Sequence, residues 1–192
     1  SGNSNTLTEN GTVTEAAVES GAELLGYSGF SDSNNLTRAS DADWDVIGTG
    51  SAYMSIWFKS TGESGTSRLF GFANSGNTVR FGILLQADGQ LNCLDDGATA
   101  SVETFLTGVN DDSVWHKADF VRVSSTERYG YLDGVLKNSV TTDSGSISDS
   151  GNLPLGIGID PSGSGFSAAA STLALARLSA TAPSATQIRQ MY

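Results

Sequence analysis

Apolar residues in this chain occur in short alternating segments, and this pattern restricts the fold more than any other feature. In YMSIWFK, residues 53–59, the apolar Met54, Ile56 and Phe58 fall on one side of an extended backbone. The segment RFGILLQ, residues 80–86, has the same spacing. A period of two residues is typical of strands that bury one face. We therefore expect β-strands in both segments, each with an apolar face turned toward a core.

Glycine and Asp-Gly pairs predict how the strands are joined. The chain has 23 glycines, which suit tight turns because glycine takes positive φ without steric cost. Asp88-Gly89 and Asp133-Gly134 each separate two apolar runs, and Asp-Gly favours a two-residue hairpin turn in which both positions have positive φ. Hairpins without intervening helical periodicity indicate an all-β fold, a two-sheet antiparallel β-sandwich of the jelly-roll type.

A single short helix is expected at the C-terminal end, in SATQIRQMY. Ser184 is followed three residues later by Gln187, the spacing of a capping box that satisfies free N–H groups at a helix start. Ile188, with Met191 and Tyr192 three and four residues further on, would dock this helix on the sandwich.

Charge and hydropathy exclude two classes of partner. The 21 acidic and 10 basic residues give a net charge of −11, which repels phosphate backbones, so no nucleic-acid partner is expected. The apolar runs are far shorter than the roughly 20 residues that cross a bilayer, so no membrane insertion is expected.

Residues 1–26 differ from the rest of the chain. They are polar and weakly patterned, with few apolar anchors. We interpret them as a leader or connector to a preceding domain, or as an edge strand, and residues 27–192 as one β-sandwich domain.

Four segments together resemble the laminin G-like modules of the concanavalin A-like lectin/glucanase superfamily. They are SVWHKADFVRV, RYGYLDGVL, LPLGIG and STLALARLSATAPSATQIRQMY. The resemblance covers residues 27–192 and implies a lectin-like sandwich. The wording of ARLSATAPSATQI and GAELLGYSGFSDSNNLTRA is most similar to versions in bacteriophage and prophage virion proteins. This similarity implies a virion surface or extracellular location and a role in host attachment.

His116, the only histidine, stands beside Trp115 and after a pair of aspartates, which is a suggestive arrangement for a catalytic or metal site. One histidine without a second His or Cys does not make a zinc site unless several carboxylates join it. No G-x-S-x-G nucleophile elbow accompanies it. The resemblance implies that the Trp-His pair is structural, and we interpret His116 in that way.

The superfamily also contains glycoside hydrolases, which need two carboxyl groups about 5 Å apart, and retaining members place them on one strand as E-x-D-x-x-E or E-x-D-x-E. The chain has no such string, because its glutamates stand singly. We therefore expect a protein that is not an enzyme, with glycoside hydrolysis as the less favoured alternative.

Calcium is the one cofactor that the sequence suggests. In laminin G-like modules, calcium is bound at the rim of the sandwich, and the matching loops here offer Asp160 with Asn74 and Asn77, as well as Asp95 and Asp96. The alternating Asp41, Asp43 and Asp45 form a second candidate set, because close carboxylates in a loop suit a hard cation. Solvated acidic loops without a metal remain the competing interpretation.

Exposed aromatic residues are the candidates for carbohydrate binding, since sugar rings stack on aromatic faces. Trp44 with Asp43 is the first candidate, and Tyr129 with Tyr131, on one face of a strand, is the second; Trp57 and Trp115 are expected in core or inter-sheet packing. The partner would be a glycan or host cell-surface polysaccharide. A purely structural virion module, such as a decoration, fibre or tail protein whose partners are other virion proteins, is the alternative.

Overall fold

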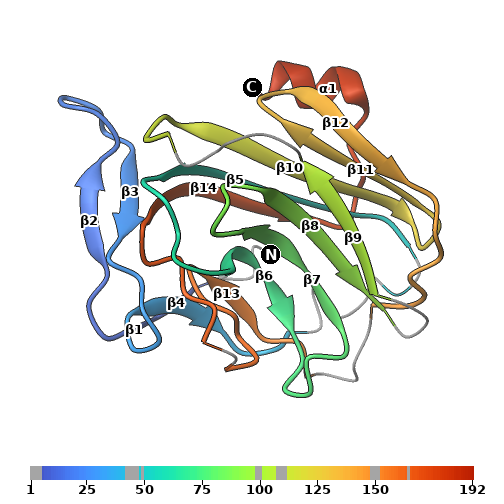
Figure 1. Ribbon diagram of the computed structural model, residues 1–192, viewed down its shortest axis with the longest axis horizontal. Coiled ribbons are helices and arrows are strands. Elements are labelled where there is room, and N and C mark those ends of the chain that lie inside the picture. The colour runs from blue at the N-terminus through green and yellow to red at the C-terminus, as the bar shows by residue number, and fades with distance from the viewer. Residues whose placement is uncertain are drawn as a thin grey trace.

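The computed structural model describes residues 6–41, 48, 50–97, 101–106, 112–147, 152–163 and 165–192, with residues 101–106 described as backbone alone. The described residues form two seven-stranded antiparallel sheets stacked face to face (Figure 1). Sheet A has the order β1 (Thr8–Asn10), β4 (Asn35–Arg38), β13 (Leu155–Ile157), β6 (Ser67–Ala73), β7 (Arg80–Leu85), β8 (Leu91–Asp96), β9 (Ser101–Leu106). Sheet B has the order β12 (Val135–Val140), β11 (Glu127–Leu132), β10 (His116–Ser124), β5 (Ala52–Ser60), β14 (Ser171–Ser179), β3 (Leu25–Ser28), β2 (Thr14–Ala17). The expected antiparallel sandwich is confirmed.

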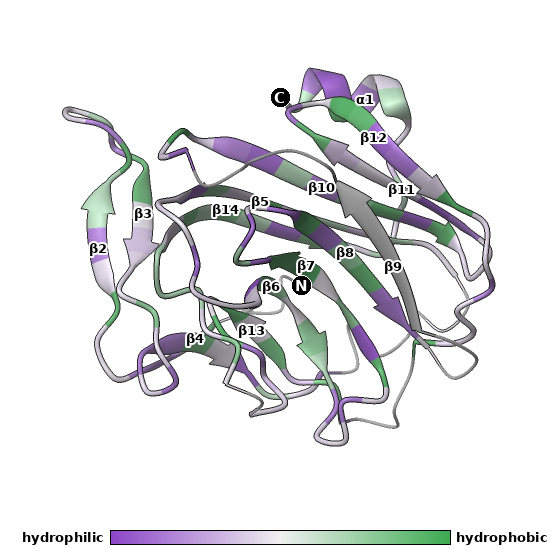
Figure 2. Ribbon diagram, in the orientation of Figure 1, coloured by the Kyte–Doolittle hydropathy of each residue, from purple (hydrophilic) through white to green (hydrophobic). Residues whose placement is uncertain are grey.

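The core lies between the two sheets and follows the alternation seen in the sequence. Met54, Ile56 and Phe58 of β5 are fully buried, as are the apolar residues of β7 at the same spacing. Figure 2 shows the corresponding bands of apolar and polar residues along β8 and β10. The prediction for both segments is confirmed, because one face of each strand supplies the core.

One of the two Asp-Gly turns has the expected geometry. Asp133 and Gly134 take φ values of 53° and 72° and join β11 directly to β12 as a two-residue turn. The hairpin expected at Asp88-Gly89 is confirmed, because β7 and β8 pair as antiparallel neighbours, but its two-residue turn is not. The two strands are joined by residues 86–90, in which only Gly89, at φ 75°, has positive φ. Asp88 instead accepts a hydrogen bond from Gln90 N (3.0 Å), which closes the wider loop.

The helix α1 (Ala185–Gln190) is confirmed with its capping box: the Ser184 hydroxyl accepts a bond from Gln187 N, and the Gln187 side chain accepts one from Ser184 N. Ile188 is fully buried on the outer face of sheet B. No helix in the described part of the chain is long and apolar enough to cross a membrane.

Residues 8–17 provide one edge strand for each sheet. β1 pairs with β4 at the edge of sheet A, and β2 pairs with β3 at the edge of sheet B. The β2–β3 hairpin projects at the left of the sandwich in Figure 1. Part of the segment interpreted as a leader or edge strand is thus paired into the sandwich.

A buried ion network ties the two sheets together. Asp95 of β8 accepts hydrogen bonds from Arg122 Nε (3.0 Å) and Arg128 Nη1 (3.1 Å), which come from β10 and β11 of the opposite sheet. All three side chains are fully buried. Arg122 also donates to three backbone carbonyl oxygens, those of Gly48, Gly50 and Gly145. Asp95, a possible rim ligand by sequence, therefore serves as an internal counter-ion.

Candidate functional site

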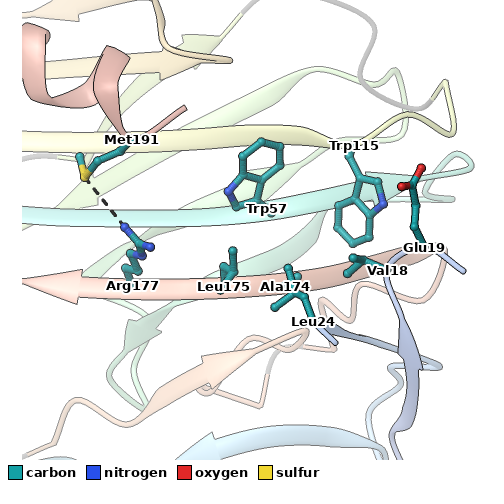
Figure 3. Close-up of a pocket in the computed structure, with 9 residues that line it drawn as sticks. All are labelled: Val18, Glu19, Leu24, Trp57, Trp115, Ala174, Leu175, Arg177 and Met191. Carbon is teal, nitrogen blue, oxygen red and sulfur yellow. Dashed lines mark hydrogen bonds between the residues drawn. The ribbon is translucent and has the colours of Figure 1, made fainter. Parts of the chain in front are cut away.

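An open groove on the outer face of sheet B is a candidate site. Its cavity measures about 390 Å³, within the usual range for small-molecule sites. The lining is mainly apolar with one acidic and one basic side chain, and we call it the aromatic groove: Val18, Glu19, Leu24, Trp57, Trp115, Ala174, Leu175, Arg177 and Met191 (Figure 3).

The alternation of β5 places Trp57 in the groove. Because Met54, Ile56 and Phe58 point into the core, Trp57 points outward, where it is only partly buried. Trp115 precedes β10 and is also partly buried. The expectation that both tryptophans pack in the core or between the sheets is wrong, because both line the outer groove.

Arg177 reaches the groove because β14 contains a bulge. Ala174 pairs with Trp57 and Arg177 pairs with Ser55, so the interval of three residues on β14 matches an interval of two on β5. Without the extra residue, Arg177 would point to the opposite face. Within this irregular stretch, Leu175 has φ 48°, a left-handed conformation that is costly for a residue with a side chain.

Three polar groups lie beside the apolar side chains of the groove. The Lys59 ammonium lies over the Trp115 ring, 5.6 Å from its centroid, in a cation–π contact. Arg177 Nη1 lies 4.0 Å from Met191 Sδ, a weak interaction drawn at the far end of the groove in Figure 3. Trp115 Nε1 is buried and has no hydrogen-bond partner among the described residues. The groove thus combines aromatic faces with hydrogen-bonding groups.

The tyrosine pair expected as a binding platform does lie on one face of β11. Tyr131 is 6% exposed and packs under α1 with Tyr53, Val121 and Ile188. Tyr129 is partly buried beside the same cluster, and its hydroxyl donates to Glu127 Oε1 (2.6 Å). Neither residue lines the aromatic groove. The alternative candidates Trp44 and Asp43 lie outside the described residues.

Asp160 and Asn74, two of the residues expected to bind calcium, use their side-chain oxygens in bonds within the protein. Asp160 is 1% exposed; its Oδ2 accepts a bond from Arg68 Nη2 (2.8 Å), and its Oδ1 accepts one from Ser162 N (2.9 Å). The Arg68 guanidinium therefore already supplies the positive charge. Asn74 Oδ1 accepts bonds from Thr78 N and Val79 N, which makes Asn74 the cap of its own turn.

The remaining candidates for calcium binding are Asn77 and the alternating aspartates. Asn77 lies in the same turn as Asn74 and has φ 56°. Asp41 pairs with Arg38, while Asp43 and Asp45 lie outside the described residues. Among the residues that the structure describes, no three His, Cys, Asp or Glu side chains gather as a metal site. Calcium binding thus stays a prediction from the sequence.

His116 fastens a hairpin turn. Its Nδ1 lies 2.8 Å from Asp133 Oδ2, and its Nε2 lies 3.2 Å from Asp112 Oδ1. Asp133 Oδ1 also accepts a bond from Lys117 N (2.8 Å), so the turn is bound to the start of β10. Burial lowers the pKa of His116, but bonds and charges of Asp133 and Asp112 raise it, and the net pKa lies above its ordinary value. These contacts support the structural interpretation of His116.

Glu63 is the buried glutamate of the described chain, and its role is structural. It is 5% exposed, and its carboxylate accepts bonds from Ala170 N (3.2 Å) and the Ser171 hydroxyl (2.6 Å). These bonds hold the start of β14 against the segment that follows β5. Glu63 therefore gives no support to glycoside hydrolysis.

The fold and the groove together define a lectin-like β-sandwich. A family model described as the concanavalin A-like lectin/glucanases superfamily matches residues 31–189. The chain belongs to this superfamily. No curated protein sequence matches the chain.

Solved structures share the fold at low sequence identity. One is a binding domain of botulinum neurotoxin DC in complex with SialylT (TM-score 0.73, 8% identity, 97% of this chain and 45% of that one). A second is domain 4 of AbnA, a GH43 extracellular arabinanase from Geobacillus stearothermophilus, in complex with arabinotriose (TM-score 0.70, 16% identity, 97% and 86%). A third is a heptameric SAP-like pentraxin from Limulus polyphemus (TM-score 0.55, 18% identity, 73% and 69%). The chain spans about half the length of the toxin binding domains (45%).

Proposed function

We propose that this protein is a non-catalytic carbohydrate-binding module whose ligand lies in the aromatic groove. The observation that carries the proposal is that Trp57 and Trp115, both partly exposed, line one cavity of about 390 Å³ on the outer face of a sheet. An open apolar site with a few convergent polar groups is the usual form of a ligand pocket. Tyr192 stacks on the Trp57 ring and Lys59 lies over the Trp115 ring, and the remaining indole surfaces that line the groove suit the apolar faces of sugar rings. Glu19 and Arg177 offer partners for hydroxyl groups.

Two relatives in fold support a glycan as the ligand class. The toxin binding domain was solved in complex with SialylT and the arabinanase domain with arabinotriose. Their sequence identity to this chain is low, so the proposal depends on the groove. The two structures support only the choice of a glycan as the ligand class. The groove also favours binding over a purely structural virion role, because a structural module needs no open aromatic cavity.

The proposed setting is the surface of a virion or an extracellular protein, with attachment to a host cell-surface polysaccharide as the role. This part of the proposal depends on the similarity of two sequence segments to bacteriophage and prophage virion proteins. Purification of the parent particle, followed by immunogold labelling of this domain, tests the virion location directly.

A glycan array tests the binding function. The wild-type protein should bind a defined set of glycans, and Trp57→Ala should weaken binding about two- to tenfold, since an aromatic contact contributes about 0.5–1.5 kcal/mol beyond its buried area. Tyr129→Ala is the matched control, because it removes a partly buried aromatic side chain from the same face of sheet B outside the groove. Absence of glycan binding by the wild type would overturn the proposal. Loss of binding in Tyr129→Ala but not in Trp57→Ala would move the site to β11.

A further inference from the structure

We propose that the aromatic groove selects glycans that carry isolated carboxylate groups, such as sialylated or uronate-containing oligosaccharides, over neutral ones. This inference depends on the proposed carbohydrate-binding function and adds the chemical class of the ligand. It follows from how positive charge is distributed in a strongly acidic chain.

Most cations of this protein are neutralised internally. The chain has ten Lys and Arg residues against 21 acidic ones. Six of the ten form ion pairs with carboxylates: Arg38, Arg68, Arg80, Lys117, Arg122 and Arg128. The other four, Lys59, Lys137, Arg177 and Arg189, form no ion pair with a carboxylate of the described residues. These four cations thus have no carboxylate partner among the described residues, although the chain has about twice as many acidic as basic residues.

Two of these four cations flank the aromatic groove. Lys59 lies on the Trp115 ring, and Arg177 lines the groove beside Met191. Arg177 acts electrostatically on Asp119, but that buried carboxylate already accepts bonds from Lys117 Nζ (2.6 Å) and the Tyr53 hydroxyl (2.7 Å). The Arg177 guanidinium makes only a weak contact through Nη1 with Met191 Sδ, which an incoming carboxylate could replace.

The spacing of the two cations matches an extended ligand rather than a single ion. Arg177 is opposite Ser55 on β5, and Lys59 is four residues further along the same strand. At about 3.3 Å per residue, their positions are roughly 13 Å apart. Trp57 lies between them, so a chain of sugar rings lying in the groove along the exposed surface of Trp57 would have a cation near each end.

The chemistry of the groove favours a carboxylate over a neutral group. A guanidinium binds a carboxylate through two parallel N–H donors, a geometry that a neutral hydroxyl group does not match. Glu19 and the net charge of −11 oppose a densely charged polyanion. We therefore expect recognition of separate carboxylates on a sugar chain and weak binding of a heavily sulfated polymer.

Paired probes test the inference. Binding of a sialylated and a uronate-containing oligosaccharide is measured by calorimetry beside their carboxyl-reduced neutral counterparts. The acidic form of at least one pair should bind roughly tenfold to hundredfold more tightly, the effect expected for one charge-assisted bonded pair. Arg177→Gln should remove this difference while leaving the melting temperature unchanged, because the side chain is exposed.

Lys137→Gln is the matched control. It removes an exposed cation without a carboxylate partner from β12 of the same sheet, away from the groove, and should leave binding unchanged. Equal binding of acidic and reduced probes, lost in Trp57→Ala, would overturn the acidic preference and leave the carbohydrate function in place. Equal loss in Arg177→Gln and Lys137→Gln would show a general charge effect and would also overturn it. Failure of every glycan to bind would instead overturn the proposed function itself.

Discussion

Trp57 and Tyr192 stack face to face, with ring centroids 5.7 Å apart and ring planes inclined by 10°. The contact joins the residues after α1 to the centre of sheet B, and Tyr192 remains 57% exposed. An offset or parallel aromatic pair of this kind contributes about 0.5–1.5 kcal/mol beyond its buried area. The C-terminal segment is thus held on sheet B by this stacked ring as well as by Ile188, which packs with Tyr53, Val121 and Tyr131 outside the groove.

Tyr192→Ala should lower the melting temperature by a few degrees, because a loss of about 1 kcal/mol corresponds to roughly 2–4 °C in a domain of this size. Thermal unfolding followed by circular dichroism gives the measurement. Tyr192→Phe keeps the ring and should behave as the wild type. Equal melting temperatures for the Ala and Phe variants would show that the stack adds no stability.

Asp95→Asn should destabilise the fold by about 3–5 kcal/mol, because it leaves Arg122 and Arg128 buried without a counter-charge. Equilibrium unfolding in urea measures the change. Asp32→Asn, which neutralises an exposed aspartate in a loop, is the control and should fall within about 0.5 kcal/mol of the wild type. A small effect at Asp95 would mean that the network rearranges around the amide.

The fold could be predicted from the sequence because the core-facing residues of β5 and β7 recur with a period of two. The faces of β5 and β7, the Asp133-Gly134 turn and the capping box at Ser184 are all local patterns with a local physical cause. The wider turn at Asp88 was missed, since Asp-Gly is compatible with more than one loop length and strand pairing selects among them.

The site was harder to predict, although part of its signal was in the sequence. Trp57 stands out of phase with Met54, Ile56 and Phe58, which already places it on the face away from the core. The position of Arg177 had no such signal, because the bulge in β14 depends on pairing with β5. The role of Asp160 depended on Arg68, which is distant in the sequence and adjacent in the fold.

Asp160→Asn should destabilise the protein equally with millimolar calcium and with chelator, because the lost partner is Arg68 rather than a metal. Melting temperatures in both conditions provide the test. A calcium-dependent rise in the wild type that is absent in Asp160→Asn would instead establish the rim site. A rise that survives in Asp160→Asn but is lost when Asp41, Asp43 and Asp45 are changed together would place the ion in the other loop.

His116 should make the stability depend on pH. Its pKa in the folded protein is raised, so protonation favours folding: the contribution is complete below the unfolded value of about 6.5 and is lost as the pH rises through the folded-state pKa. The melting temperature of His116→Gln, compared with the wild type from acidic to alkaline pH, should differ most on the acidic side. A difference of the same size at every pH would contradict this.

The bulge in β14 lies between residues that pack in the core and residues that line the groove. Leu173 and Leu178 pack on the core opposite Phe58 and Met54, and the extra residue between them is accommodated on the outer side. Exchanges or short insertions in this stretch can therefore change the groove without moving either leucine. Selection can act on ligand preference here while the folded frame is preserved, and related modules with other specificities are expected to differ first in the length and composition of residues 174–177.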